Sequence, residues 1–126
     1  MAMEYLVTGG CGFIGSNLVR YLVRHGQQVR VLDNLATGSR RNIGDLLDRG
    51  SVEFLHGDVR DLATVRQACT GIRYVLHMAA LPSVVISVEN PILTNAVNLD
   101  GTVNLLVAAR DAGVDRFVFS SSSAIY

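Results

Sequence analysis

The sequence is poor in cysteine and proline, and neither sign of charge is in excess. Two cysteines, Cys11 and Cys69, are too few and too irregularly placed for a disulfide framework or a zinc site, so no metal site is expected. Two prolines, 12 glycines and 49% hydrophobic residues are typical of a folded globular chain. Eleven basic residues balance eleven acidic ones, which excludes a global field that would attract nucleic acid or an anionic membrane.

Long apolar segments are also missing. The first residues lack a basic stretch followed by an apolar core, so they do not resemble a signal peptide. No run approaches the roughly 18 apolar residues of a membrane span. The sequence also contains no repeat, low-complexity tract or linker. We therefore expect a single cytoplasmic domain over residues 1–126, with neither a membrane nor a nucleic acid as partner.

Short apolar runs alternate with segments of helical period along the whole chain. The runs predict strands at 5–7, 29–32, 52–55, 74–76 and 116–119. The helical spacings predict helices at 13–25, 41–47, 62–68 and 92–112, with Gly26 and Gly113 ending the first and the last. Strands that alternate with helices imply right-handed crossovers and a parallel sheet. The prediction is an α/β, Rossmann-like doubly wound sheet of about five strands in the order 3-2-1-4-5.

A glycine-rich loop joins the first predicted strand to the first predicted helix. Gly9 permits a sharp turn, Gly12 lets the backbone approach a pyrophosphate, and Gly15 allows close packing of helix on strand. The free amides and the dipole of the helix then face the phosphates. Because strand, loop and helix come in the required order, the pattern predicts a dinucleotide site.

Asp33 ends the second predicted strand, at the distance from the loop where a carboxylate accepts both ribose hydroxyls of an adenosine. A carboxylate there repels a 2′-phosphate, which favours NAD over NADP. Arg40 and Arg41 are the counter-argument, since an arginine nearby could accommodate that phosphate. They lie beyond the Asn34–Gly38 turn, so we expect NAD.

Six motifs follow one another along the chain: Thr8–Gly15, Asp33–Gly38, Gly57–Asp61, His77–Ala80, Asn95–Thr102 and Phe119–Tyr126. Together they resemble the extended short-chain dehydrogenase/reductase family, and most closely its UDP-sugar 4-epimerases of the UDP-glucose or UDP-N-acetylglucosamine type. The resemblance covers the whole chain.

The resemblance implies a role for each matching position. The pyrophosphate would lie on the glycine loop, the adenosine ribose beside Asp33, the adenine beside Asp58, and the nicotinamide end near Asn98 and Ser120. Ser122, four residues before Tyr126, matches the catalytic serine or threonine of the family. The cofactor residues implied are Gly9, Gly12, Phe13, Ile14, Gly15, Asp33, Asn34, Thr37, Gly38, Asp58, Val59, Met78, Ala79, Ala80, Asn98 and Ser120.

Several of these positions also have a purely structural interpretation. Asp58 follows a glycine at a strand end, where aspartate often forms a turn. His77 ends an apolar strand, and we interpret it as a core histidine with a satisfied ring rather than as a base. Asn98 could cap or crosslink its own helix, and Cys11 is most simply a small loop residue.

The reaction implied by the resemblance is oxidation of a sugar 4-hydroxyl to a 4-keto sugar, followed by reduction on the other face. Dehydratases of the family have an Asp-Glu pair after the catalytic residue, and UDP-glucuronate decarboxylases have a Glu at its second position. Ser123 and Ala124 stand there in this chain, which favours an epimerase. The segment Ser83–Ser87 lacks the Pro and Arg frequent in those epimerases, which leaves the UDP-sugar open. Alternatives are a uronate epimerase, a nucleotide-sugar reductase and a non-catalytic NAD-sensing module.

The chain stops a few residues after the fifth predicted strand, whereas a doubly wound sheet normally continues. We expect an N-terminal fragment that lacks the Tyr-x-x-x-Lys pair and the substrate domain of the family, that binds NAD weakly, if at all, and that does not epimerise. The strand 116–119 would then leave an apolar edge, which favours self-association and fits a homodimer.

Overall fold

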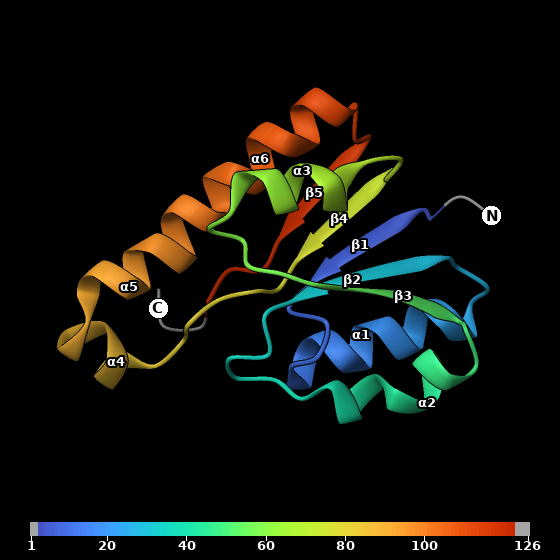
Figure 1. Ribbon diagram of the computed structural model, residues 1–126, viewed down its shortest axis with the longest axis horizontal. Coiled ribbons are helices and arrows are strands. Elements are labelled where there is room, and N and C mark those ends of the chain that lie inside the picture. The colour runs from blue at the N-terminus through green and yellow to red at the C-terminus, as the bar shows by residue number, and fades with distance from the viewer. Residues whose placement is uncertain (1–2, 123–126) are drawn as a thin grey trace.

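The computed structural model describes residues 3–122 and shows a twisted sheet with helices on both faces (Figure 1). All strands pair in parallel, in the order β3-β2-β1-β4-β5. This confirms the predicted fold class and strand order. The strands are β1 (Tyr5–Thr8), β2 (Val29–Asp33), β3 (Val52–His56), β4 (Tyr74–His77) and β5 (Arg116–Phe119).

Both faces of the sheet are covered, and the two faces have separate cores. Successive side chains of a strand point to opposite faces, so Leu6 and Val7 of β1 belong to different clusters. Figure 1 shows α1 and α2 on one face and α3 and α6 on the other. The helical elements are α1 (Phe13–Arg24), the 3₁₀ helix η1 (Arg40–Ile43), α2 (Gly44–Asp48), α3 (Leu62–Cys69), α4 (Val84–Glu89), α5 (Pro91–Asn95), the π-helical η2 (Ala96–Asp100) and α6 (Gly101–Ala112).

The long helix predicted over 92–112 forms as one helical run, α5-η2-α6, with a π-helical turn in its middle. Gly113 follows it with φ +74°, and Gly26 follows α1 with φ +75°, as the sequence predicts. Within residues 3–122, this run (Pro91–Ala112) is the one helix long and apolar enough to cross a membrane by length and composition alone. Its inner face, with Val97, Leu105 and Ala108, packs into the core that also contains residues of α3.

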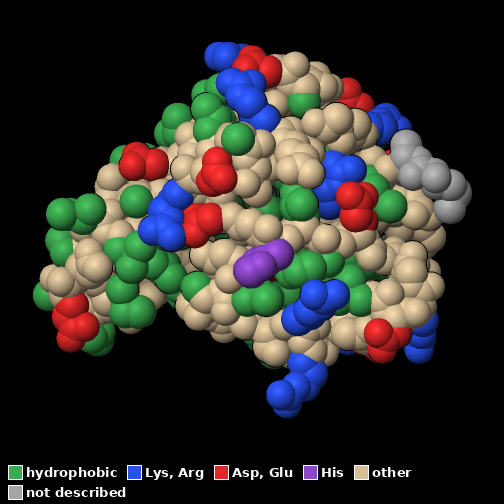
Figure 2. Space-filling model, in the orientation of Figure 1, with side chains coloured by type: hydrophobic (Ala, Val, Ile, Leu, Met, Phe, Trp, Pro, Cys, Tyr) green, Lys and Arg blue, Asp and Glu red, His purple; other side chains and the backbone are tan. Residues whose placement is uncertain are grey.

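One helix was not expected from the sequence. Residues 84–89 form α4, in a segment for which the sequence analysis predicts neither a helix nor a strand. Ser83 caps the helix, because its Oγ accepts the backbone N–H of Ile86 at 3.2 Å. Figure 2 shows hydrophobic side chains gathered over α4 and α5, and the exposed ones include Val84, Val88 and Ile92.

Candidate dinucleotide-binding site

A pocket of about 450 Å³ lies at the carboxyl ends of the strands, where β1 lies between β2 and β4. The direction of winding reverses there, and doubly wound sheets bind their ligands at this point. Most predicted cofactor residues line it. They are Gly9, Gly12, Phe13, Ile14, Gly15, Asp33, Asn34, Thr37, Val59, Met78, Ala79, Ala80 and Ser120.

The glycine loop forms one wall of the pocket, and its shape requires glycine at two positions. Gly9 has φ +69°, and a Cβ there would lie 2.9 Å from the backbone of Ala79. A Cβ at Gly15 would collide with the carbonyl oxygen of Gly9. A Cβ at Gly12 would meet only that same oxygen, at 3.4 Å, so Gly12 leaves the loop open towards the pocket. The turn at Gly9 and the close packing at Gly15 agree with the loop pattern, and the space at Gly12 is compatible with the approach of a pyrophosphate.

Helix α1 begins at the pocket with its first amides uncapped. Gly12 is the N-cap residue, and within residues 3–122 no side chain forms a capping hydrogen bond to this end. The first N–H groups of a helix have no partner inside the helix, and together with the dipole they form an anion site. The residues present therefore fit a pyrophosphate.

Asp33 lies at the end of β2 and is buried among residues of the loop. One carboxylate oxygen, Oδ2, accepts the N–H of Cys11 at 2.9 Å, and Oδ1 accepts the N–H of Leu35 at 2.8 Å. A carboxylate has about four acceptor positions, so both oxygens keep capacity for ribose hydroxyls. Leu35 has φ +62°, a left-handed conformation that is uncommon outside glycine.

Gly38 lies behind the loop rather than in the pocket. A Cβ at Gly38 would lie 2.7 Å from the carbonyl group of Cys11. The backbone at position 38 can therefore pack this closely against the glycine loop only when the residue is glycine. The Cys11 carbonyl also accepts the side-chain amide of Asn42 at 2.8 Å. Burial raises the pKa of the Cys11 thiol to about 11, which leaves it protonated and agrees with a small loop residue.

Arg40 is one of the two arginines that, from the sequence, could accommodate the 2′-phosphate of NADP. Its guanidinium lies over the ring of Phe54, 5.0 Å from the ring centroid. The arginine is therefore engaged by β3 in this structure.

Asp58 forms a turn after β3, which is the structural role that its position after a glycine at a strand end predicted. Its Oδ1 accepts the backbone N–H of Arg60 at 2.9 Å, and the side chain of Arg60 pairs with both oxygens. Asn34 donates to Oδ2 at 3.1 Å. These hydrogen bonds, chiefly from Arg60, hold the pKa of the Asp58 carboxyl well below its usual range.

His77 is a core histidine, as predicted, and its hydrogen bonds determine its tautomer. The Thr8 hydroxyl accepts the N–H groups of Met78 and Ala79, both at 3.1 Å, so its own proton points to His77 Nδ1, 2.6 Å away. The ring proton is therefore on Nε2, which donates to the Thr102 hydroxyl at 2.8 Å. That hydroxyl in turn donates to the carbonyl of Asn98 at 2.7 Å. The chain of bonds ties the Met78–Ala80 turn to the long helix.

Asn98 supports the pocket from outside. Its Oδ1 accepts the N–H of Leu81 at 2.8 Å, and its Nδ2 donates to the carbonyl of Leu81 at 3.0 Å. These two hydrogen bonds connect the π-helical turn to the segment after β4. The Asn98 side chain therefore does not crosslink its own helix, which was the structural role considered from the sequence.

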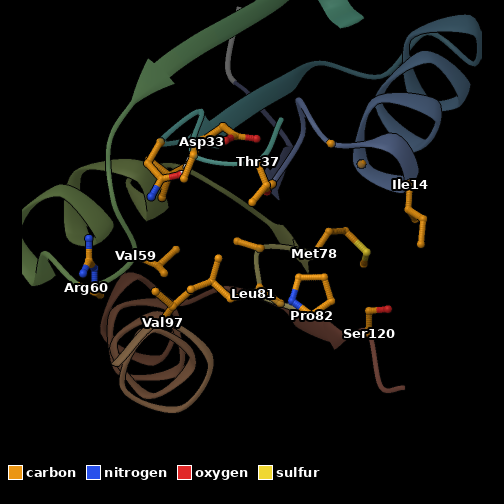
Figure 3. Close-up of a pocket in the computed structure, with 18 of the residues that line it drawn as sticks. Ile14, Asp33, Thr37, Val59, Arg60, Met78, Leu81, Pro82, Val97 and Ser120 are labelled. Carbon is orange, nitrogen blue, oxygen red and sulfur yellow. Dashed lines mark hydrogen bonds between the residues drawn. The ribbon is translucent and has the colours of Figure 1, made fainter. Parts of the chain in front are cut away.

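Ser120 lines the end of the pocket opposite Arg60 (Figure 3). Ser122 lies two residues further on and is exposed. Ser123, Ala124 and Tyr126, which the sequence analysis used to separate reaction types, lie outside the described residues.

Some lining residues were missed by the sequence analysis. Arg60 and Gly57 belong to a quoted motif, so their spacing could have identified them. Leu32 belongs to β2, and Ala36 to the turn after it. The other apolar ones come from the segment after β4 and from the long helix, where only packing brings them to the pocket. The missed residues are Leu32, Ala36, Gly57, Arg60, Leu81, Pro82, Leu93 and Val97.

Known proteins share this sequence and arrangement. Residues 5–126 match the model of the NAD dependent epimerase/dehydratase family. The UDP-glucose 4-epimerase of Erwinia amylovora is 39% identical over 128 residues, which cover 98% of this chain and 38% of that protein. The UDP-glucose 4-epimerase of Streptomyces lividans is 42% identical, with 100% of this chain and 38% of that protein covered. The chain thus spans about two fifths of the length of these relatives.

Solved structures show the same likeness. The Thermus thermophilus UDP-glucose 4-epimerase in complex with NAD has a TM-score of 0.84 and 46% identity, over 95% of this chain and 38% of that one. DesIV, a dTDP-glucose 4,6-dehydratase from Streptomyces venezuelae solved with NAD, has a TM-score of 0.85 and 37% identity, over 91% of this chain and 38% of that one. The uncapped loop and Asp33 fit the cofactor of these proteins. The chain belongs to the NAD-dependent epimerase/dehydratase family.

Proposed function

We propose that the protein to which this chain belongs is a nucleotide-sugar 4-epimerase, acting on UDP-glucose and UDP-galactose or on their N-acetylated equivalents through a 4-keto sugar. Residues 1–126 would form its NAD-binding domain. The main observation behind the proposal is that one pocket is lined both by Asp33, which would bind the adenosine ribose, and by Ser120. Ser120 lies two residues before Ser122. The names of the relatives support the substrate class.

The cofactor would be held by three parts of the pocket. The amides at the start of α1 would bind the pyrophosphate, Asp33 would bind the adenosine ribose, and the turn Met78–Ala80 would run along the dinucleotide towards Ser120. When bound, NAD supplies reversible uptake of a hydride, and the protein contributes orientation and electrostatics.

Ser122 would act at the 4-oxygen of the sugar. A serine hydroxyl can accept the proton of a sugar hydroxyl and can donate to the carbonyl oxygen that replaces it. It can thus hold the oxygen in both states and assist proton transfer. Ser123 and Ala124, which follow it, have no acidic or basic side chain, so elimination of water is not supported by these positions.

The test is an assay of the intact protein with UDP-galactose and, in parallel, with UDP-N-acetylgalactosamine and a UDP-uronate. We expect formation of the 4-epimer, and a loss of roughly 10²–10⁴ in kcat for Ser122→Ala. Ser121→Ala is the matched control and should change kcat little. A Ser122→Ala protein with full activity would contradict the assignment. An intact protein that binds NAD and acts on no nucleotide sugar would support the sensing module instead.

For the 126-residue chain by itself we propose weak NAD binding and no epimerisation. All eleven Lys and Arg residues of these 126 are arginine, so the segment contains no Tyr-x-x-x-Lys pair. Conversion of UDP-galactose by this chain alone would contradict the proposal.

We further propose that the intact protein is a cytoplasmic homodimer and that the 126-residue chain by itself pairs along β5. Among the described residues β5 is an edge strand, and Val118 and Phe119 on it are 43% and 57% exposed. An exposed apolar edge favours pairing with a second copy. Sedimentation equilibrium of the 126-residue chain should show a dimer that Val118→Lys weakens, and a strictly monomeric unmodified chain would exclude this contact.

A further inference from the structure

The carboxylate of Asp58 is saturated by donors of this chain. Its Oδ1 accepts the backbone N–H of Arg60 at 2.9 Å and the Nε–H at 3.0 Å. Its Oδ2 accepts Arg60 Nη2 at 2.7 Å and Asn34 Nδ2 at 3.1 Å. A carboxylate offers about four acceptor positions, and all four are used. A further donor can therefore bind only by replacing one of these.

The four hydrogen bonds are unequal. Three come from Arg60, and two of those are charge-assisted and side by side, which makes them the strong ones. The bond from Asn34 is the longest, and its donor is neutral. The Asn34 amide is thus the partner that an incoming ligand would displace. An amide NH₂ and the 6-amino group of a purine are donors of the same kind, so one can take the place of the other on Oδ2.

The surroundings keep Arg60 in place. Asn104 of α6 donates to the carbonyls of Val59 and Arg60 at 3.0 and 3.2 Å, which anchors the turn. Figure 3 shows Val59 and Arg60 at the end of the pocket away from Ser120. The Arg60 guanidinium also lowers the pKa of the Asp58 carboxyl, so that this group is only an acceptor near neutral pH. An ionised carboxylate accepts from an amine and repels a carbonyl oxygen.

We propose that Arg60 is a positioning residue that makes this site selective for 6-amino purines. It holds Asp58 in the orientation in which the amine of adenine replaces the Asn34 amide on Oδ2. The inference rests on the proposed function and on the expectation from the family resemblance that the adenine lies beside Asp58. It predicts that the arginine affects the choice of purine more than it affects dinucleotide binding in general.

The test compares binding of NAD with binding of nicotinamide hypoxanthine dinucleotide, which has a carbonyl in place of the 6-amino group. Dissociation constants are measured by titration calorimetry on the intact protein freed of cofactor. We expect the unmodified protein to prefer NAD by roughly tenfold or more, since the hypoxanthine carbonyl cannot replace the Asn34 amide as a donor to Oδ2 and is repelled by the ionised carboxylate. In Arg60→Met the preference should fall to about threefold or less, and Arg60→Lys should retain part of it.

Matched variants separate the possible outcomes. Arg73→Met removes another exposed arginine, paired with Asp115, and should leave the preference unchanged. An equal loss of affinity for both dinucleotides in Arg60→Met, or tighter NAD binding, would overturn the inference. Asp58→Asn should abolish or reverse the preference, because its amide can donate to the hypoxanthine carbonyl. An unchanged preference in Asp58→Asn would reject the adenine contact itself, and absence of NAD binding by the unmodified protein would reject the proposed function.

Discussion

Asp33 is bound to the glycine loop and faces the proposed ribose site. Its hydrogen bond from the Cys11 amide fixes the loop, and the residue also lines the pocket. A change at this residue should therefore act on both the shape of the loop and the ligand.

We expect Asp33→Asn to weaken NAD binding by about 10- to 100-fold, since charge-assisted hydrogen bonds contribute about 1.5–3 kcal/mol. It should weaken NADP binding less, because the repulsion of a 2′-phosphate is also removed. Titration with both dinucleotides measures the two effects. Asp115→Asn, far from the pocket, is the control. Equal losses for NAD and NADP would show that Asp33 acts only on the loop.

His77 should make stability depend on pH. Its ring is 1% exposed, and burial lowers its pKa from 6.5 to about 4, so the folded state favours the neutral ring. A depressed pKa means that the unfolded state takes up the proton first. The stabilisation is therefore complete above pH 6.5 and is lost as pH falls towards 4, by about 3 kcal/mol.

Urea unfolding between pH 7.5 and 4 measures this dependence. His77→Phe should lower the free energy of unfolding at pH 7 and flatten the slope between pH 6.5 and 4. An unchanged slope in His77→Phe would assign the dependence to other groups.

At the scale of elements, the long helix approaches the adenine end of the pocket through a glycine. A Cβ at Gly101 would lie 2.5 Å from Cγ2 of Val59, a residue that lines the pocket. The first turn of α6 can pack there only because the side chain is missing. In the preceding π-helical turn, Asn98 forms a hydrogen bond with Leu81, and Val97 lines the pocket.

We expect Gly101→Ala to destabilise the protein by about 1–3 kcal/mol, because the added methyl group overpacks a filled contact, and to weaken NAD binding by displacing Val59. Gly44→Ala is the matched control, since Gly44 is helical and a Cβ there meets nothing within 4 Å. It should stabilise by about 0.4–1 kcal/mol. Thermal unfolding and NAD titration compare the two, and a stabilised Gly101→Ala protein would contradict the packing argument.

At the scale of the whole molecule, the pocket draws residues from the glycine loop, from the ends of β2 and β5, from the segments after β3 and β4, and from the long helix. A ligand in it therefore contacts parts of the chain that are far apart in sequence. Binding to the folded state alone should stabilise all of them together.

We expect NAD at 100 times its dissociation constant to add about 2.7 kcal/mol to the free energy of unfolding, and to raise Tm by several degrees. Differential scanning calorimetry with NAD, and with NADP at the same concentration as control, measures the shift. A larger shift with NADP would contradict the assignment of the cofactor.

Sequence alone predicted the strands, their order and most of the pocket. Parallel strands covered on both faces require short apolar runs, and a phosphate loop requires glycine at set positions, so both leave local patterns. Gly9 and Gly15 follow from such a pattern, and the structure has the backbone shape that it predicts.

Tertiary structure alone decided how the pocket is supported. Asn98 binds Leu81 across 17 positions, and Thr8 binds His77 across 69, and no local pattern indicates such partners. The sequence was sufficient to predict the glycine loop, Asp33 and the motif after the third strand, because each depends on nearby residues. The hydrogen bond from Asn34 to Asp58 and the tautomer of His77 were not predicted, because hydrogen bonds between distant segments depend on how the whole sheet and its helices pack.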